Sequence, residues 1–286
     1  MHKLILTITL ISYVLLAEGQ SGWLRNKGEL WSQIGYQNWT SERYFNLEAM
    51  ENKTNAFSTS ELSAYAEYGF SSKITGLFYL PISKTAEYSN TERVRGLGDL
   101  RIELKFKPFR NVAPFAIQIG AEIPTGKSNA IAYNDNHQFG YVNLPTGDGE
   151  WNFWTHFIAS KSISKSLFGT AYAAYNLRTS YAEIKFNDQA KAGLEIGYSP
   201  YSNAWIIGKY SALMNIEQNE GVADFVRQSG TTYSQFSLMF LTSIYRNFGM
   251  NIQLNGFTDI PIRRQNVYSS NYLSFGLVYE IKQKQE

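Results

Sequence analysis

The sequence of 286 residues has no cysteine, three histidines and seven prolines. The absence of cysteine excludes a disulfide framework, a thiolate zinc site and a cysteine nucleophile. Only 17% of the residues are charged, and 26 basic against 24 acidic residues leave a net charge of +2. That charge is too small for a nucleic-acid-binding surface. Beyond residue 19 no apolar run reaches the ~18 residues that a membrane-spanning helix needs.

Aromatic residues, in contrast, are abundant, with 20 Tyr, 18 Phe and 6 Trp. A disordered chain would be poor in aromatics, and a helical membrane protein would be clearly hydrophobic, whereas the mean hydropathy here is −0.29. Two classes remain, a soluble all-β protein and a membrane β-barrel. A barrel of this length commonly forms one domain.

Residues 1–19 have the pattern of a secretory signal peptide. Lys3 gives a positive start, an apolar run extends from Leu4 to Ala17, and Ala17 and Gly19 occupy the −3 and −1 positions of an export cleavage site. The run is too short for a spanning helix, and an uncleaved N-terminal anchor is the alternative. We therefore expect residues 20–286 to form a single exported domain.

Apolar and polar residues alternate through most of the remaining chain, which is typical of two-faced β-strands. Leu273, Phe275 and Leu277, for example, share one face of the last segment. About twelve such segments are predicted, near residues 28–40, 56–70, 73–84, 97–109, 111–123, 149–161, 164–178, 185–199, 202–217, 231–246, 249–261 and 270–282. Short turns alternate with longer connections, near residues 41–55, 85–96, 124–148, 179–184, 218–230 and 262–269.

This alternation of short and long connections is typical of outer-membrane barrels, which have tight periplasmic turns and longer outside loops. Large apolar residues on almost every strand would overfill one small interior, but they suit a lipid-facing surface. The sequence therefore predicts an all-β fold, a transmembrane antiparallel up-and-down β-barrel of about 12 strands with a polar lumen. Eight strands are filled by side chains and sixteen leave a channel, so we expect a narrow or partly plugged lumen.

The last strand resembles the C-terminal signal by which bacterial outer-membrane proteins engage their assembly machinery. Ser274-Phe275-Gly276-Leu277-Val278-Tyr279-Glu280-Ile281 is similar to its polar-x-Gly-x-x-aromatic-x-hydrophobic pattern. It departs from the pattern because five residues follow Ile281, where an aromatic terminus is usual. The resemblance implies that the assembly machinery and outer-membrane lipid are partners of this chain.

Residues 95–200 resemble a porin-like outer-membrane family known as the phenol meta-degradation pathway proteins, whose members are often called transporters. The resemblance rests on Gly96-Leu97-Gly98-Asp99 running into Lys105-Phe106, on Ile123-Pro124-Thr125-Gly126, and on Leu144-Pro145-Thr146-Gly147-Asp148-Gly149. It implies passage of small, including hydrophobic or aromatic, compounds across the outer membrane of a Gram-negative bacterium. From the residues alone, these glycines and prolines are interpreted as loop and strand-end residues rather than as substrate contacts.

Strand phase assigns a set of mixed charges to the interior. The candidate pore-lining residues are Asp99, Arg101, Glu103, Lys105, Glu122, His156, Lys191 and Glu195. The alternation also turns inward the aromatics Trp31, Tyr65, Tyr79, Trp154, Tyr172 and Trp205. Such charges either brace the barrel internally or form a constriction that selects solutes, and both interpretations stay open.

Enzymatic and metal sites have little support. His137 and His156 are the only histidines after the signal peptide, without metal-ligand spacing, and Phe157-Ile158 after His156 breaks the His-x-Ser pattern of outer-membrane phospholipases. We expect no cofactor, no metal and no catalytic residue. The sequence favours an outer-membrane channel or passive transporter for a small-molecule solute. A structural or adhesive barrel and a barrel-type lipid hydrolase are the alternatives.

Overall fold

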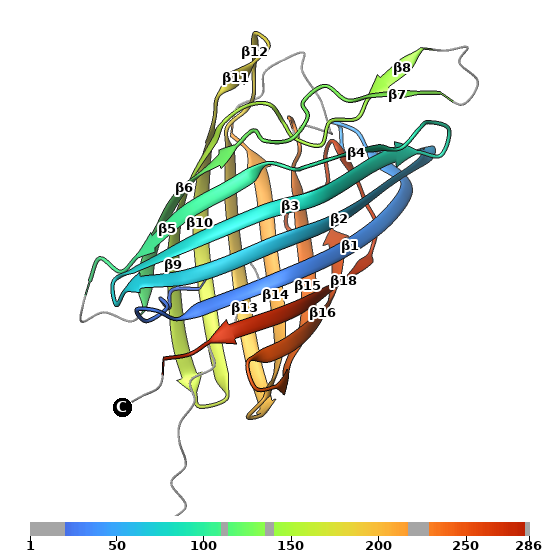
Figure 1. The fold of residues 1–286 in the computed structure, drawn as a ribbon. Helices are drawn as coiled ribbons and strands as arrows, with labels where there is room; N and C mark the ends of the chain where they lie inside the picture. The colour runs from blue at the N-terminus through green and yellow to red at the C-terminus, as the bar shows by residue number, and fades with distance from the viewer. Residues whose placement is uncertain (1–20, 110–113, 135–139, 217–228, 284–286) are drawn as a thin grey trace, which may run out of the picture.

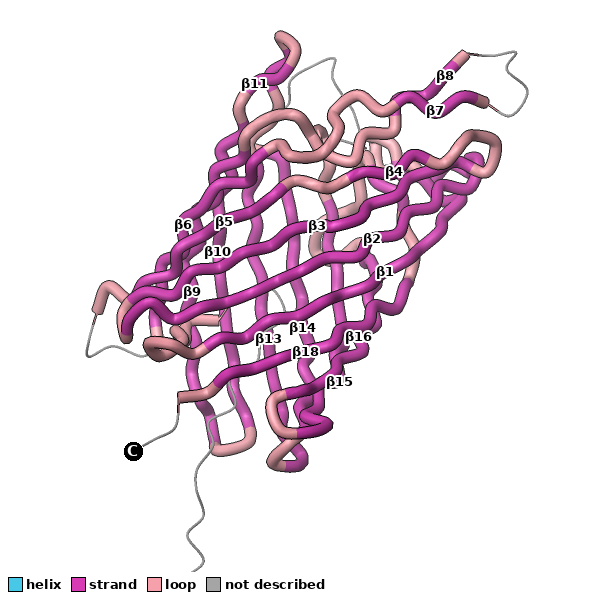
Figure 2. Tube along the Cα trace, viewed as in Figure 1, coloured by secondary structure: helices cyan, strands magenta, loops and turns pink. Residues whose placement is uncertain are grey.

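The computed structural model describes residues 21–109, 114–134, 140–216 and 229–283 (Figure 1). The predicted signal peptide of residues 1–19, the predicted turn at Arg110-Asn111, and His137 all lie outside the described residues. The described chain consists of strands, turns and loops (Figure 2). None of its segments is a helix long and apolar enough to cross a membrane.

Twelve strands form one closed antiparallel barrel, in which each strand pairs with its neighbours along the chain. The barrel strands are β1 (Leu30–Phe45), β2 (Glu51–Ser71), β3 (Ile74–Tyr88), β5 (Leu100–Phe106), β6 (Phe115–Ile123), β9 (Asn152–Ser164), β10 (Leu167–Arg178), β13 (Gln189–Tyr201), β14 (Ala204–Asn215), β15 (Tyr233–Tyr245), β16 (Phe248–Thr258) and β18 (Tyr272–Ile281). The barrel closes because β1 pairs with both β2 and β18. The predicted fold class is confirmed.

The barrel has two different ends. Tight turns such as those between β2 and β3 or between β15 and β16 lie at one end, which we call the short-turn end, and β18 ends there (Figure 1). The other end, the long-loop end, carries six short strands. These are β4 (Val94–Gly96), β7 (Ile131–Tyr133), β8 (Tyr141–Asn143), β11 (Ser180–Tyr181), β12 (Ile184–Lys185) and β17 (Val267–Tyr268).

The predicted strand phase is confirmed in β18 and β5. Leu273, Phe275 and Leu277 are exposed on the outside of the barrel, whereas Val278 is buried inside it. On β5 the outward Ile102 is 46% exposed and the inward Glu103 is 5% exposed. The apolar outer surface and polar inner wall therefore have the arrangement of a barrel that contacts lipid.

The first three strands are longer than predicted. β1 continues to Phe45 and β2 begins at Glu51, so the expected loop of residues 41–55 is mostly paired strand. The Asn46 side chain closes this hairpin by accepting hydrogen bonds from the backbone N–H groups of Glu48 and Met50, at 3.1 and 2.8 Å. Alternation is hard to detect there because residues 51–55 of β2 are polar on both faces, whereas Phe45 at the end of β1 is buried.

The described residues 124–134 and 140–148 of the connection between β6 and β9 pack over part of the long-loop end. They contain the β7–β8 hairpin, seen above the barrel in Figure 1. Ala132 and Leu144 from this connection are fully buried in a cluster with Phe57 and Tyr268 from the barrel side. The connection is thus partly covered by contact with the barrel rather than simply exposed.

Candidate functional site

Three neighbouring strands, β5, β6 and β9, form a charged inner wall. The ladder places Gln118 of β6 directly opposite His156 of β9, and Glu103 of β5 opposite Gly120. Gln118 Nε2 donates a 2.9 Å hydrogen bond to Glu103 Oε2, and His156 Nε2 lies 3.4 Å from Glu103 Oε1. Because Gly120 has no side chain, the Glu103 side chain lies across it. The structure thus brings two predicted residues, Glu103 and His156, into contact.

Arg101 and Lys105 flank Glu103 on the same face of β5. The Arg101 guanidinium lies 3.7 Å from Glu103 and 5.3 Å from the centre of the Tyr79 ring. Glu122 stands opposite Arg101 in the ladder and accepts a hydrogen bond from Asn152 Nδ2 at 3.4 Å. Lys105 is completely buried below this level. Two of these contacts cross between strands, since Arg101 reaches Tyr79 of β3 and Glu122 reaches Asn152 of β9.

The remaining predicted charges lie further round the barrel on β13. Glu195 Oε2 lies 3.3 Å from Lys209 Nζ, and the ladder makes these two residues direct neighbours. Lys191, on the same face of β13, borders the two cavities described below.

Asp99 has a different place, because it precedes β5 at the long-loop end. Its carboxylate accepts hydrogen bonds from the backbone N–H of Gly126 at 2.9 Å and of Asp148 at 2.7 Å. The Thr125 hydroxyl donates to the Gly98 carbonyl at 2.7 Å. Asp99 therefore ties together the three motifs that carry the family resemblance.

We call this arrangement the outer knot, made of residues 98–99, 124–127 and 145–148. Gly126 and Gly147 are packed so closely that a Cβ on Gly126 would lie 2.6 Å from the Gly147 Cα. The Thr146 hydroxyl accepts a 3.0 Å hydrogen bond from the Lys127 N–H. Glycine is thus required here by close approach of two backbones, which agrees with the interpretation of these motifs as loop structure.

A buried ion pair lies beside the outer knot. Arg178 Nε donates a 3.0 Å hydrogen bond to Glu150 Oε1, and Arg178 Nη2 is a second donor to the same oxygen. Burial, together with the neighbouring carboxylate of Glu150, raises the pKa of Asp148 to about 8. Carboxylate oxygens of Asp99, Glu122 and Asp148 lie within 4.8 Å of one another. Both oxygens of Asp99 already accept backbone hydrogen bonds, so Asp99 and Asp148 serve the outer knot, and Glu122 lies beside it.

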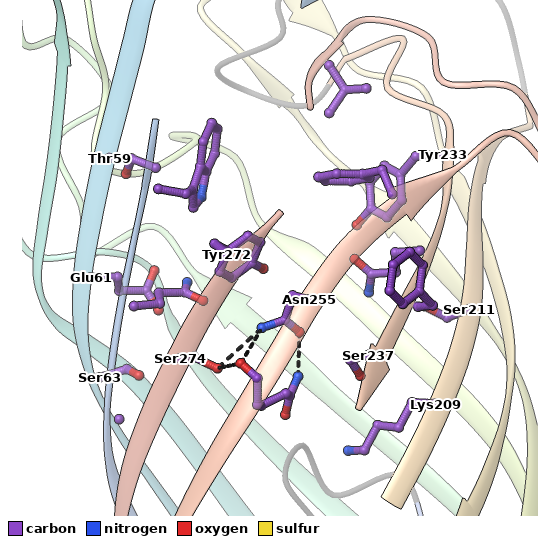
Figure 3. A pocket seen from close by; sticks show the side chains of 18 of the residues that line it. Thr59, Glu61, Ser63, Lys209, Ser211, Tyr233, Ser237, Asn255, Tyr272 and Ser274 are labelled. Carbon is purple, nitrogen blue, oxygen red and sulfur yellow. Dashed lines mark hydrogen bonds between the residues drawn. The ribbon is translucent and has the colours of Figure 1, made fainter. Parts of the chain in front are cut away.

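The half of the lumen nearest the long-loop end encloses a cavity of about 520 Å³ (Figure 3). Its walls carry hydroxyl, amide and aromatic groups, with Glu61 on one side and Lys209 on the other (Figure 3). Asn255 Nδ2 donates to Ser274 Oγ at 3.3 Å, so part of the amide surface is held in place by hydrogen bonds. The other labelled lining residues are Thr59, Ser63, Ser211, Tyr233, Ser237 and Tyr272.

A smaller cavity of about 90 Å³ lies deeper, against the charged wall. Its lining comprises Tyr65, Arg101, Glu103, Gln118, Trp154, His156 and Lys191. Trp154 stacks on His156 with ring centres 5.6 Å apart, and Tyr65 and Lys191 also line the larger cavity. The two cavities therefore adjoin at these two side chains.

Below the cavities the lumen is packed by apolar side chains, which we call the inner cluster. Its buried members are Trp31, Tyr65, Leu77, Phe168, Trp205, Ile207, Met239, Leu241 and Val278. Ile207 and Met239 face each other across β14 and β15 and are fully buried. Trp23 and Tyr79 pack against this cluster. At this level the described part of the interior holds closely packed, buried apolar side chains.

No protein-family model and no curated protein matches this sequence. Solved structures match the fold. The COG4313 outer membrane channel from Pseudomonas putida F1 is similar with a TM-score of 0.70 at 12% identity, over 93% of this chain and 100% of that one. The translocator domain of the autotransporter NalP from Neisseria meningitidis gives 0.56 at 8%, over 90% of each chain. The NanC porin gives 0.52 at 9%, over 87% of this chain and 100% of that one. The fold is that of an outer-membrane β-barrel.

Within this barrel, strand phase predicted which charges and aromatics are buried but missed two features. Tyr65, Tyr79 and Tyr172 line the larger cavity, as the inward prediction requires. Three members of the inner cluster, Trp31, Tyr65 and Trp205, were predicted to face inward. Ile207 and Met239 were missed because they lie in short stretches that are apolar on both faces, where alternation carries no signal. The contacts of residues 21–28 inside the barrel were also missed, although Trp23 followed by Arg25 in the sequence was a signal.

Proposed function

We propose that this protein is an outer-membrane passive channel or transporter for small molecules. The observation that carries the proposal is the 520 Å³ cavity inside a closed barrel, which has the size of a small-ligand site. Exposed apolar side chains around the barrel provide the lipid-contacting surface. The fold neighbour named as an outer membrane channel is consistent with this role.

Hydrophobic or aromatic compounds are the solute class that the cavity supports best. Tyr65, Tyr172, Tyr233 and Tyr272 contribute aromatic surface to its lining, and planar rings stack on such surfaces. The amides and hydroxyls of the opposite strands supply neutral hydrogen-bonding groups. The charges have both signs, so no strong single-sign field selects ions.

Solute uptake by proteoliposomes tests the proposal. We expect purified protein to admit small aromatic compounds and the Ser237→Trp variant, which fills the cavity, to admit them at least five-fold more slowly. Leu238→Trp is the matched control, because Leu238 is the next residue on β15 and points outward. Folding of each variant is checked by heat-modifiable gel mobility. Equal uptake by both variants would contradict a route through this cavity.

A structural or adhesive barrel without transport is the second candidate. The observation that favours it is the inner cluster, which closes the lumen at the short-turn end. Absence of uptake and of conductance in folded protein would establish this candidate in place of the channel. A lipid hydrolase is the least supported role, because His156 is buried on the lumen side against Glu103 and Trp154.

A further inference from the structure

Residues 21–28, which we call the inner strap, enter the barrel at the short-turn end without joining the sheet. Ser21 and Gly22 are buried. The Gly22 N–H donates a 2.8 Å hydrogen bond to Ser160 Oγ on β9. A Cβ at Gly22 would clash with the carbonyl oxygen of Pro114, so the strap runs close against the inner wall. The strap therefore fills space within the lumen rather than extending the barrel.

Arg25 anchors the strap to charges on two strands. Its Nε lies 3.1 Å from Glu67 of β2, and its Nη1 lies 3.4 Å from Glu280 of β18. Both acids stand opposite Trp31 in the ladder of β1, and the guanidinium lies 6.0 Å from the centre of that ring. The Arg25 backbone N–H also donates to Thr75 Oγ1 at 2.9 Å. One side chain thus joins three neighbouring strands from the inside.

Trp23 fills the space beside this anchor. Its ring meets Phe168 edge-on, with centres 5.6 Å apart, and Phe168 in turn lies 5.3 Å from Trp205. The strap therefore adds a large aromatic group to the inner cluster, at the level where the lumen is closed. The 520 Å³ cavity lies on the long-loop side of this level.

The contacts of the strap differ in kind from those of the barrel strands. Each barrel strand is held by two ladders of backbone hydrogen bonds. From Ser21 to Arg25 the strap is held mainly by side chains, and backbone bonding to the barrel begins where the Gly28 N–H meets the Gly69 carbonyl at 2.8 Å. Between Ser21 and Arg25 the strap is held by ion pairs, a ring contact and two hydrogen bonds to side chains, without a strand ladder, so it can separate while the barrel stays intact.

We propose that the inner strap is the gate of the channel. Arg25 holds the strap in the closed position through its ion pairs, and Trp23 blocks the lumen. The proposal rests on the proposed channel function and assigns the regulation of that route. Release of Arg25 from Glu67 and Glu280 withdraws Trp23 from the inner cluster and joins the cavity to the short-turn end. Solutes held in the cavity then gain an exit.

Uptake by strap variants in proteoliposomes tests the gate. We expect Arg25→Gln and Trp23→Ala to admit small solutes at least three-fold faster than the parent. Lys27→Gln is the matched control, because Lys27 is an exposed cation of the same strap and should leave uptake unchanged. Gel mobility before and after heating verifies that every variant is folded.

A cross-link provides a second measurement that does not depend on loss of a contact. The chain has no cysteine, so the double variant Arg25→Cys with Thr75→Cys carries the only two thiols and keeps Trp23; in the parent the Arg25 N–H lies 2.9 Å from Thr75 Oγ1. A reducible bifunctional thiol reagent should fix the strap and lower uptake, and reductant should restore it. Each single-cysteine variant, treated identically, should show no reversible change.

The outcomes separate the gate from the channel. If the parent admits solute and Arg25→Gln, Trp23→Ala and the cross-linked protein admit it equally fast, the gate is refuted and the channel stands. If no folded variant admits any solute, the channel is refuted and the gate is refuted with it. Faster uptake in the two strap variants together with reversible inhibition by the cross-link supports both.

Discussion

Replacement of Arg178 by methionine should destabilise the barrel far more than loss of a comparable exposed ion pair. Arg178 ends β10 at the long-loop end, and the side chains of Arg178 and Glu150 are 1% and 0% exposed. Its guanidinium also lies 4.9 Å from the Phe186 ring centre and 3.8 Å from Asp148. The Arg178→Met variant keeps apolar volume and removes the charge, which leaves a buried carboxylate without its cation.

The expected loss follows from this burial. Removing one partner of a buried ion pair typically reduces the free energy of unfolding by about 3–5 kcal/mol, because the other charge stays desolvated. Arg43 and Glu51 form a pair of similar geometry, with contacts of 2.6 and 2.8 Å, but their side chains are 55% and 46% exposed. Exposed pairs are worth about 0–1 kcal/mol, so Arg43→Met is the matched control.

Urea unfolding in detergent micelles, followed by tryptophan fluorescence and gel mobility, measures both losses. The double variant Arg178→Met with Glu150→Leu should recover most of the stability, because no unpaired charge is then buried between these two positions. If Arg178→Met loses no more than Arg43→Met, or if the double variant is as unstable as Arg178→Met, the burial argument is wrong.

Three further predictions concern the loops and the outer surface. The pKa of Asp148 is raised from 3.8 to about 8, so between these pH values the folded state holds a proton that the unfolded state releases. The free energy of unfolding should therefore fall from pH 4 to pH 8. Urea midpoints at each pH should show a smaller fall for the Asp148→Asn variant. Gly126→Val should open the outer knot against Gly147 and increase protease cleavage within residues 124–148, whereas Gly208→Val, with open space around its Cβ, should not. Leu277→Arg, at an outward side chain that is 69% exposed, should lose about 2–4 kcal/mol in a lipid bilayer, and an unchanged urea midpoint there would contradict lipid contact at this position.

Strand number and phase could be predicted from sequence because a membrane barrel imposes one rule on every strand. Successive side chains of a strand point to opposite faces, so an outward Leu277 requires an inward Val278. The face of one residue thus fixes the faces of its neighbours. The same rule correctly predicted that Glu103 and Lys105 face inward, where both are buried. A row of charged residues would otherwise be assumed to be exposed to solvent. The rule failed at the ends of β1 and β2 nearest the long-loop end, where residues 51–55 of β2 are polar on both faces.

The role of Asp99 could not be predicted in the same way. Strand phase placed it with Arg101 and Glu103, but the strand begins only at Leu100, so Asp99 belongs to a loop and follows no alternation. Its partners are backbone N–H groups 27 and 49 residues away, and a sequence does not show which distant amides are free. The recurrent Gly-Asp and Pro-Thr-Gly pieces were visible, whereas their mutual contact required the fold.

The packing of the lumen near the short-turn end could not be predicted from the sequence either, and this packing bears on function. A barrel of twelve strands is too wide for its own inward side chains to fill easily, yet Ile207 and Met239 are fully buried. The packing is completed by a group that comes from outside the sheet, because Trp23 reaches the inner cluster from the strap. The width of the barrel alone would predict an open channel, whereas the burial of these side chains alone would predict a structural barrel. The proposed gate reconciles them, because it closes the lumen while Trp23 is in place and opens it when the strap leaves.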